Sequence, residues 1–281
     1  MRLTNRLNLP DALYRAAKKV LGAYDKGDAH MSITGLIDPP RKAALEILHE
    51  DELTEDVADT IWALLGSSLH NLLEAAHSDD AATERRLFAK MSGWNLSGAM
   101  DVYEAPGHIQ DYKFTSVFSL KNGKPKPEWH QQLNGYAWLL RENNLPALSA
   151  EVVVFLRDWS KMDAIKDGSY PQHQVLRLPI PMWEPAVAEQ WVYQRVLLHQ
   201  QALIDLPLCT PEDRWSRPGK YAVMKPGQKK AIKLHDTHAD AARHSSELPG
   251  SFVENRPGMN VRCQAYCAAR PFCTQAANGG T

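Results

Sequence analysis

Cysteine is absent from the first 208 residues of this 281-residue chain, and all four cysteines lie in the last 73 residues. Long apolar runs are also missing, and no stretch approaches the roughly 20 apolar residues of a membrane-spanning helix. The N-terminus lacks an apolar segment followed by a small-residue cleavage site, which argues against a secretory signal. We therefore expect a cytoplasmic protein without a membrane partner. In that compartment, clustered cysteines indicate a metal site rather than two disulfides.

The charge is nearly balanced overall, with a net charge of −1, and 44% of the residues are hydrophobic, as in ordinary folded proteins. The balance hides an asymmetry. From Cys209 onward the chain has eleven basic and six acidic residues, so this segment carries +5 and the first 208 residues carry −6. A basic tail on an acidic body is typical of a polyanion-binding surface beside a carboxylate-rich site, although an uneven scatter of solvated charges gives the same count.

The apolar periodicity predicts an α/β fold in the first part of the chain. Two strands joined by a turn at Ser92-Gly93 and a third strand at 109–114 should be followed by a helix and a buried strand. This order predicts a small mixed sheet flanked by helices. The expected helices cover 11–24, 41–50, 51–76 (with Thr54 as N-cap), 128–143 and 182–204, and further strands cover 151–159 and 173–180.

The chain changes character near residue 207, where Pro, Gly, Lys and Arg become frequent. We expect a helical N-terminal region and core over 1–206 and a basic C-terminal region over 207–281. The second region should contain a hairpin around Pro226-Gly227 and a short helix near 237–244. Its apolar content is thin, so we expect it to need packing against the body, a metal staple, or both.

Asp111 and Lys113 are two positions apart on the third expected strand, so the carboxylate and the amine lie on the same face. The connection from 105 to 108 is short, so the preceding strand should be an antiparallel neighbour, with Ser97 and Asp101 on one face. Asp101 can then approach Asp111. Two close carboxylates repel each other, and a divalent cation relieves that repulsion. Lys113 can stabilise charge on a phosphoryl transition state. The alternative is an ordinary surface Asp–Lys pair.

The flanking helices and the loop contribute further polar side chains. His70, a candidate metal ligand, follows Gly66 by one turn, and a glycine there lets a ligand approach closely. Gln132 and Tyr136 share a helix face and can contact a phosphate or hold Lys113. The intervening loop can meet a nucleic-acid backbone through its amines. These are Lys121, Lys124 and Lys126.

The stretches GSSLH, SGAMD, DYK and QLNGY occur in this order between about residues 60 and 160. Together they resemble the motifs of the PD-(D/E)XK nuclease superfamily, most of all its RecB-like and CRISPR-associated exonuclease branch. The resemblance implies a restriction-endonuclease-like core and a metal-dependent deoxyribonuclease, an exonuclease of DNA recombination, repair or processing in a bacterium or a phage. It implies DNA ends or single strands as the partner, with a strand-annealing protein or a helicase beside it.

The resemblance also implies a role for each matching residue. One or two Mg²⁺ or Mn²⁺ ions would be held by His70, Asp101, Asp111 and the Tyr112 carbonyl. Lys113 would be the catalytic lysine. Gln132 and Tyr136 would support the catalytic set.

The cysteines are spaced as one early residue, Cys209, and a late trio, Cys263, Cys267 and Cys273. Four thiolates can hold zinc or an iron–sulfur cluster, and unligated thiols are a third possibility. The same nuclease branch often ligates a [4Fe–4S] cluster with one cysteine before and three after a variable segment, which this arrangement resembles. The trio departs from that pattern, because three residues rather than two lie between Cys263 and Cys267. The ligands would staple the basic tail.

Two other functions fit the same residues. The chain could be a non-catalytic DNA-binding or scaffold protein that keeps a nuclease fold and a structural four-cysteine zinc site or cluster. It could also be a zinc-stapled interaction protein without a nucleic-acid role.

Overall fold

The computed structural model describes residues 2–22, 26–76, 81–83, 86–120 and 123–277, without the side chains of 81–83. The chain forms two compact units. The first comprises Met1–Ala44 and Glu50–Leu206, and the second comprises Leu45–His49 and Pro207–Thr281. Within the described residues, no helix is both long enough and apolar enough to cross a membrane.

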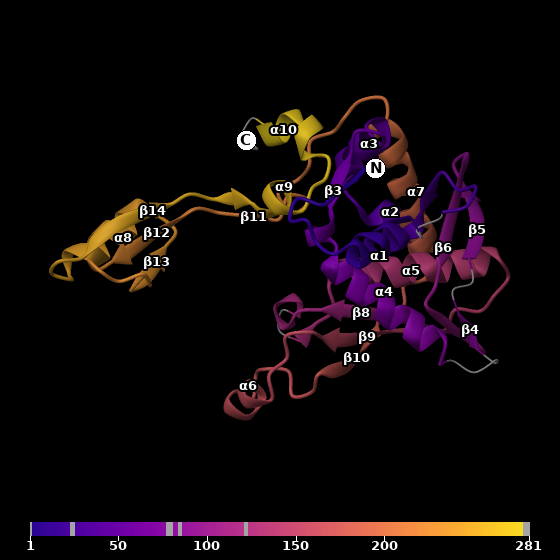
Figure 1. The fold of residues 1–281 in the computed structure, drawn as a ribbon, viewed down its shortest axis with the longest axis horizontal. Coiled ribbons are helices and arrows are strands. Elements are labelled where there is room, and N and C mark those ends of the chain that lie inside the picture. Colours follow the sequence, from indigo (N-terminus) through magenta and orange to yellow (C-terminus); the bar gives the residue numbers. More distant parts are fainter. Residues whose placement is uncertain (1, 23–25, 77–80, 84–85, 121–122, 278–281) are drawn as a thin grey trace. The chain divides into compact units, whose positions relative to one another are not determined.

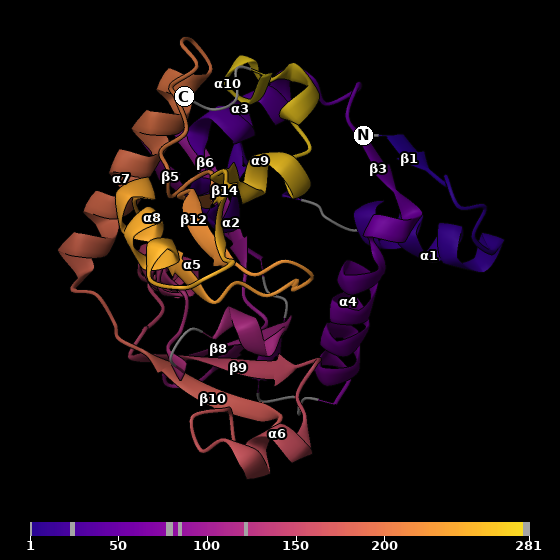
Figure 2. The same ribbon diagram turned by 90° about the vertical axis from the view of Figure 1, so that its left-hand side faces the viewer.

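A five-stranded mixed sheet is the centre of the first unit, with strand order β10-β9-β8-β7-β4. Strands β8 and β9 are parallel, with Asp111 opposite Val152, and the other pairs are antiparallel. Figures 1 and 2 show β8, β9 and β10 side by side beneath helix α5. The predicted α/β class with a mixed sheet is confirmed. The strands are β4 Ala81–Thr83, β7 Val102–Glu104, β8 His108–Thr115, β9 Ser149–Leu156 and β10 Val175–Ile180.

A smaller sheet of order β2-β6-β5 lies in the same unit. It consists of β2 Met31–Ser32, β5 Arg86–Met91 and β6 Trp94–Ala99. Ser92 and Gly93 join β5 to β6 with positive φ at both positions (46° and 81°), the backbone of a two-residue hairpin turn, so the predicted turn is confirmed.

The second strand of this hairpin was expected to continue through Asp101, and that expectation is wrong. Strand β6 ends at Ala99, and β7 begins at Val102 in the other sheet. Asp101 therefore lies in the bend where the chain passes from one sheet to the other.

Helix α5, Pro127–Glu142, connects the parallel strands β8 and β9 and is largely buried. Its side chains Leu133, Leu139 and Leu140 are wholly buried with strand residues of the core. The helices expected near 11–24, 41–50, 128–143 and 182–204 are confirmed with small shifts of their ends. The other helices of this unit are α1 Asp11–Gly22, α2 Ile33–Ile37, α4 Ile61–Glu74, α6 Lys161–Lys166 and α7 Pro185–Ala202, with 3-10 turns η1 Val57–Asp59 and η2 Val117–Ser119. Helix α3, Pro40–Leu48, begins in the first unit, and its residues from Leu45 onward belong to the second.

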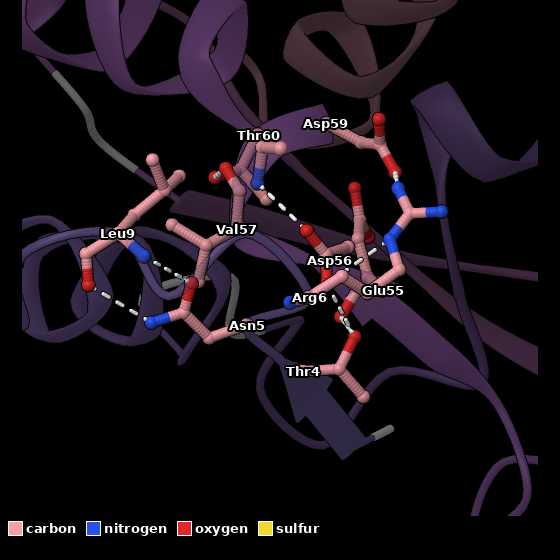
Figure 3. Close-up of polar contacts among 10 residues, drawn as sticks. Thr4, Asn5, Arg6, Leu9, Glu55, Asp56, Val57, Asp59 and Thr60 are labelled. Carbon is pink, nitrogen blue, oxygen red and sulfur yellow. Dashed lines mark hydrogen bonds and ion pairs between the residues drawn. The ribbon is translucent and has the colours of Figure 1, made fainter.

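Helix α4 begins later than the sequence predicts, and Thr54 is not its N-cap. Residues Thr54–Asp56 form strand β3, which pairs in parallel with β1, Arg2–Thr4. The Asp56 carboxylate accepts hydrogen bonds from Thr4 Oγ1 (2.7 Å), the Arg6 amide (2.8 Å) and the Ala58 amide (3.1 Å). Figure 3 shows these contacts around Asp56. Pairing with a segment about fifty residues away thus replaces the first turns of the expected helix.

The second unit contains a three-stranded sheet of order β13-β12-β14 with helix α8 packed on it. The hairpin turns at Gly227, which has a φ of 76°, so the predicted hairpin and the helix near 237–244 are confirmed. Strand β14 was not predicted. The elements are β11 Ser216–Arg217, β12 Lys220–Met224, β13 Lys233–His235, α8 His238–Ser246, β14 Phe252–Arg256, β15 Met259–Asn260, α9 Val261–Ala265, η4 Arg270–Phe272 and α10 Thr274–Ala277.

Candidate active site

The two candidate carboxylates meet at the middle of strand β8. Asp111 is on this strand and only 2% exposed. Asp101 comes from the bend before β7, and its Oδ2 accepts a hydrogen bond from the Tyr112 amide at 2.7 Å. Because Tyr112 is the neighbour of Asp111, this bond holds the Asp101 side chain beside the buried carboxylate.

Asp111 has two side-chain partners among the described residues. Lys113 Nζ lies 2.6 Å from Oδ2, and Gln132 Nε2 donates to Oδ1 at 2.8 Å. Burial raises the pKa of the Asp111 carboxyl to about 6; the positive charge of Lys113 opposes this rise, and the charge of Asp101 adds to it. A carboxylate in this environment favours either a proton or an additional cation.

His70 reaches the same place from helix α4. Its Nδ1 lies 3.3 Å from Asp101 Oδ1, and the hydrogen bond to this carboxylate raises the pKa of the imidazole, although burial opposes the rise. The ring of Tyr112 contacts the imidazole edge to face, with 6.1 Å between centroids. The charges of Asp111 and Lys113 also act on the imidazole, so the four groups form one electrostatic cluster.

Gln132 and Tyr136 project from the same face of helix α5, and the Gln132 amide donates to the Tyr136 hydroxyl at 3.2 Å. The sequence suggested that these two side chains contact a phosphate or hold Lys113. In the structure the Gln132 amide donates to Asp111 instead, so its geometry is that of a group that positions the carboxylate.

Close packing explains why position 98, in the SGAMD stretch, is a glycine, and the sequence did not reveal this. A Cβ at this position would lie 2.9 Å from the Tyr136 ring and 3.0 Å from Leu139. The absence of a side chain therefore lets α5 approach β6 and brings Tyr136 to the site. Only the tertiary contact identifies this role.

The three loop lysines differ in their position. Lys121 lies outside the described residues, and Lys124 is exposed. Lys126 is half-buried, and its ammonium lies 5.6 Å from the centroid of the Trp129 ring. Burial lowers the pKa of Lys126, Glu128 opposes this effect, and the charge of Lys113 lowers the pKa further. Lys126 thus adds positive potential near Lys113.

The donor types at the site suit a hard divalent cation, since carboxylate oxygens and an imidazole lie together. Asp111 Oδ2 is buried, and among the described residues the Lys113 ammonium is the cationic group that contacts it, at 2.6 Å. As they stand, His70 and Lys113 hold the two carboxylates, and no three His, Cys, Asp or Glu side chains among the described residues enclose a single metal position. The residues therefore fit Mg²⁺ or Mn²⁺ in their donor types, and a metal centre on them stays a prediction.

The four cysteines all belong to the second unit, and each is of intermediate exposure. The Gln275 side chain links the two ends of this segment, because it accepts from the Cys209 amide (2.8 Å) and donates to the Cys209 carbonyl (3.0 Å). This bracket places the helix that follows Cys273 beside Cys209. A four-cysteine metal centre on Cys209, Cys263, Cys267 and Cys273 stays a prediction.

Comparisons with known proteins give only distant likenesses. No family model and no curated protein matches the chain. One solved structure, titled as that of SSO0001, is 18% identical with a TM-score of 0.47, covering 66% of this chain and 84% of that one. An alkaline exonuclease from Laribacter hongkongensis is 12% identical with a TM-score of 0.39, covering 69% of this chain and 95% of that one.

Proposed function

We propose that this protein is a PD-(D/E)XK-type DNA exonuclease that hydrolyses phosphodiester bonds with the help of Mg²⁺ or Mn²⁺. The observation that carries the proposal is the cluster of Asp101, Asp111, Lys113 and His70, drawn from three separate segments to one point of β8. A buried carboxylate whose pKa is raised and an adjacent ammonium are unfavourable for stability alone, which favours a catalytic role.

Each residue has a distinct part in this reaction. The cation would be held by Asp101, Asp111, His70 and the Tyr112 carbonyl. A cation bound there would lower the pKa of the attacking water and neutralise the charge of a phosphate oxygen. Lys113 stabilises the negative charge that develops on the phosphoryl group.

The supporting residues fix this arrangement and attract the substrate. Gln132 holds the orientation of Asp111, and Tyr136 holds Gln132. Lys126 and Lys124 attract the DNA backbone. The second unit, with a net positive charge in its sequence, adds to that attraction.

The cysteines of the second unit have a structural part in this proposal. A [4Fe–4S] cluster on the four thiolates, or zinc as the alternative, closes the loop from Cys209 to Cys273 and staples the basic segment. Hydrolysis of a phosphodiester consumes no electrons, so an electron-transfer role is not required. The setting is DNA recombination, repair or processing in a bacterial or phage system, beside a strand-annealing protein or a helicase.

Digestion of labelled DNA tests the proposal. Linear substrates labelled at the 5′ or 3′ end and a closed circle are incubated with Mg²⁺, with Mn²⁺ and with EDTA. We expect metal-dependent loss of the linear substrates only, and no reaction by Asp111→Ala or Lys113→Ala, while Lys18→Ala on α1 retains activity. Intact linear DNA under all metal conditions, with binding retained, would instead establish the non-catalytic DNA-binding scaffold.

A further inference from the structure

An aromatic ring and an arginine stack on each other next to the candidate active site. The Arg157 guanidinium lies 3.8 Å from the centroid of the Trp62 ring, and Trp62 is 53% exposed. Phe114, the residue after Lys113 on β8, contacts Trp62 with 6.5 Å between ring centroids. The pair is thus attached to the strand that carries the catalytic residues.

The backbone fixes the position of this pair. The Arg157 amide donates to the Thr115 carbonyl at 2.9 Å, which holds Arg157 at the end of β8. Trp62 is in the first turn of α4, the helix that carries His70. His70 lies eight positions after Trp62, which is about 12 Å along the helix axis, the length of a few nucleotides.

Arg157 differs from the arginines that stabilise the fold. Arg177, for example, makes a two-pronged ion pair with Glu151. In the part of the chain that the structure describes, no carboxylate or carbonyl oxygen pairs with the exposed guanidinium of Arg157. Stacking on Trp62 holds the guanidinium in place while its N–H donors stay available, an arrangement that suits a phosphate.

The surface between Trp62 and His70 is open. Gly66 lies between them on α4, and among the described residues no atom outside the adjoining backbone of this helix comes within 4 Å of the position of a Cβ there. None of the described residues of α4 is fully buried, so the helix presents much of its surface to solvent. A ligand can therefore approach the helix backbone along this line.

We propose that Trp62 and Arg157 form a nucleotide-binding subsite for a single-stranded DNA segment. The indole ring stacks on an unpaired base, and the guanidinium pairs with a phosphate of the same segment. The strand then passes Gly66 and reaches the carboxylates near His70. A base in a duplex is already stacked, so the subsite favours unpaired ends. This inference rests on the proposed nuclease function.

Binding measured in EDTA tests the subsite without cleavage. The fluorescence anisotropy of a labelled thymidine 12-mer and of a blunt duplex is titrated with wild-type protein, Trp62→Ala and Arg157→Gln. We expect a loss of single-strand affinity of roughly tenfold in Trp62→Ala, which loses the stacked base, and in Arg157→Gln, which loses the phosphate contact. The salt dependence separates the roles, because Arg157→Gln lowers the slope by about 0.7 and Trp62→Ala leaves it unchanged.

Matched substitutions control for nonspecific effects. Leu72→Ala removes another exposed apolar side chain from α4, and Arg15→Gln removes another exposed charge from the same unit. Both should bind within twofold of the wild type. Trp62→Phe keeps a packed ring and is expected to retain most of the affinity, which guards against misfolding of the alanine variant.

A second variant tests the path along α4. Gly66→Leu introduces a good helix former into empty space, so its melting temperature should not fall, while single-strand binding should fall at least tenfold. Wild-type affinity in Gly66→Leu would overturn the path.

The outcomes separate the subsite from the nuclease. Wild-type affinity for single strands in Trp62→Ala and Arg157→Gln, with metal-dependent digestion intact, would overturn the subsite and leave the nuclease. Single-strand binding that depends on both residues, without digestion under any metal condition, would support the subsite and refute the nuclease.

Discussion

Replacing Asp111 by Asn should stabilise the metal-free protein above pH 6. Burial raises the pKa of the Asp111 carboxyl from 3.8 to about 6, in spite of the opposing charge of Lys113. Between these two values the folded protein binds more protons than the unfolded chain. The free energy of unfolding therefore falls as the pH rises through this window. Asn has no charge to bury and keeps an oxygen to accept from Gln132.

The size of this effect follows from the pKa shift. A rise of about two units corresponds to roughly 3 kcal/mol of unfolding free energy. In a unit of this size 1 kcal/mol shifts the melting temperature by about 2–4 °C, so Asp111→Asn should melt about 6–12 °C higher at pH 8 in EDTA. The gain should disappear below about pH 3, where the Asp111 carboxyl is protonated in both the folded and the unfolded state.

Thermal unfolding followed by circular dichroism between pH 3 and pH 9 measures the difference, with Asp205→Asn as an exposed control. Adding Mg²⁺ or Mn²⁺ should stabilise the wild type more than the Asn variant, because the cation neutralises a charge that only the wild type has. A variant that is less stable at pH 8, or a difference that does not change with pH, would refute the description of Asp111 as a desolvated charge.

Three further changes probe other parts of the molecule. Gly98→Ala places a methyl group against the Tyr136 ring, so initial rates on linear DNA should fall about tenfold with a loss of about 1–3 kcal/mol in stability, and an unchanged rate would contradict the packing role. Asp56→Asn should lower the melting temperature at pH 7. The hydrogen bond from the Arg6 amide is the largest cause that holds the pKa of Asp56 below its usual value, so the difference from the wild type should shrink as acid protonates Asp56. A difference that does not change with pH would contradict this role of the Asp56 carboxylate. Cys263→Ser should remove the visible absorbance of an iron–sulfur cluster and destabilise the second unit; a colourless wild type with one bound zinc would instead establish the zinc alternative.

The local elements of this fold could be predicted from the sequence because their signals are local. Helix α5 has helical apolar spacing, the β5–β6 hairpin has a turn-forming Ser-Gly pair, and β8 to β10 have strand-forming residues between turns. The candidate site residues could also be named from the sequence, because the stretches GSSLH, SGAMD, DYK and QLNGY follow one another along the chain. These stretches lie on a helix, at the end of a strand and the bend after it, on another strand and on a second helix. The sequence by itself determined the helices and strands that have local signals, and it named the candidate residues that the structure brings together on β8.

The tertiary structure decided how these residues meet. The position of Asp101 in a bend depends on the chain leaving one sheet for another, and the delayed start of α4 depends on β1 pairing with β3. Neither contact has a local signature. The Gln132 amide donates to Asp111, and Trp62 holds Arg157, because α5, α4 and β9 converge on β8. Such contacts join residues far apart in the chain, and their geometry is fixed by packing.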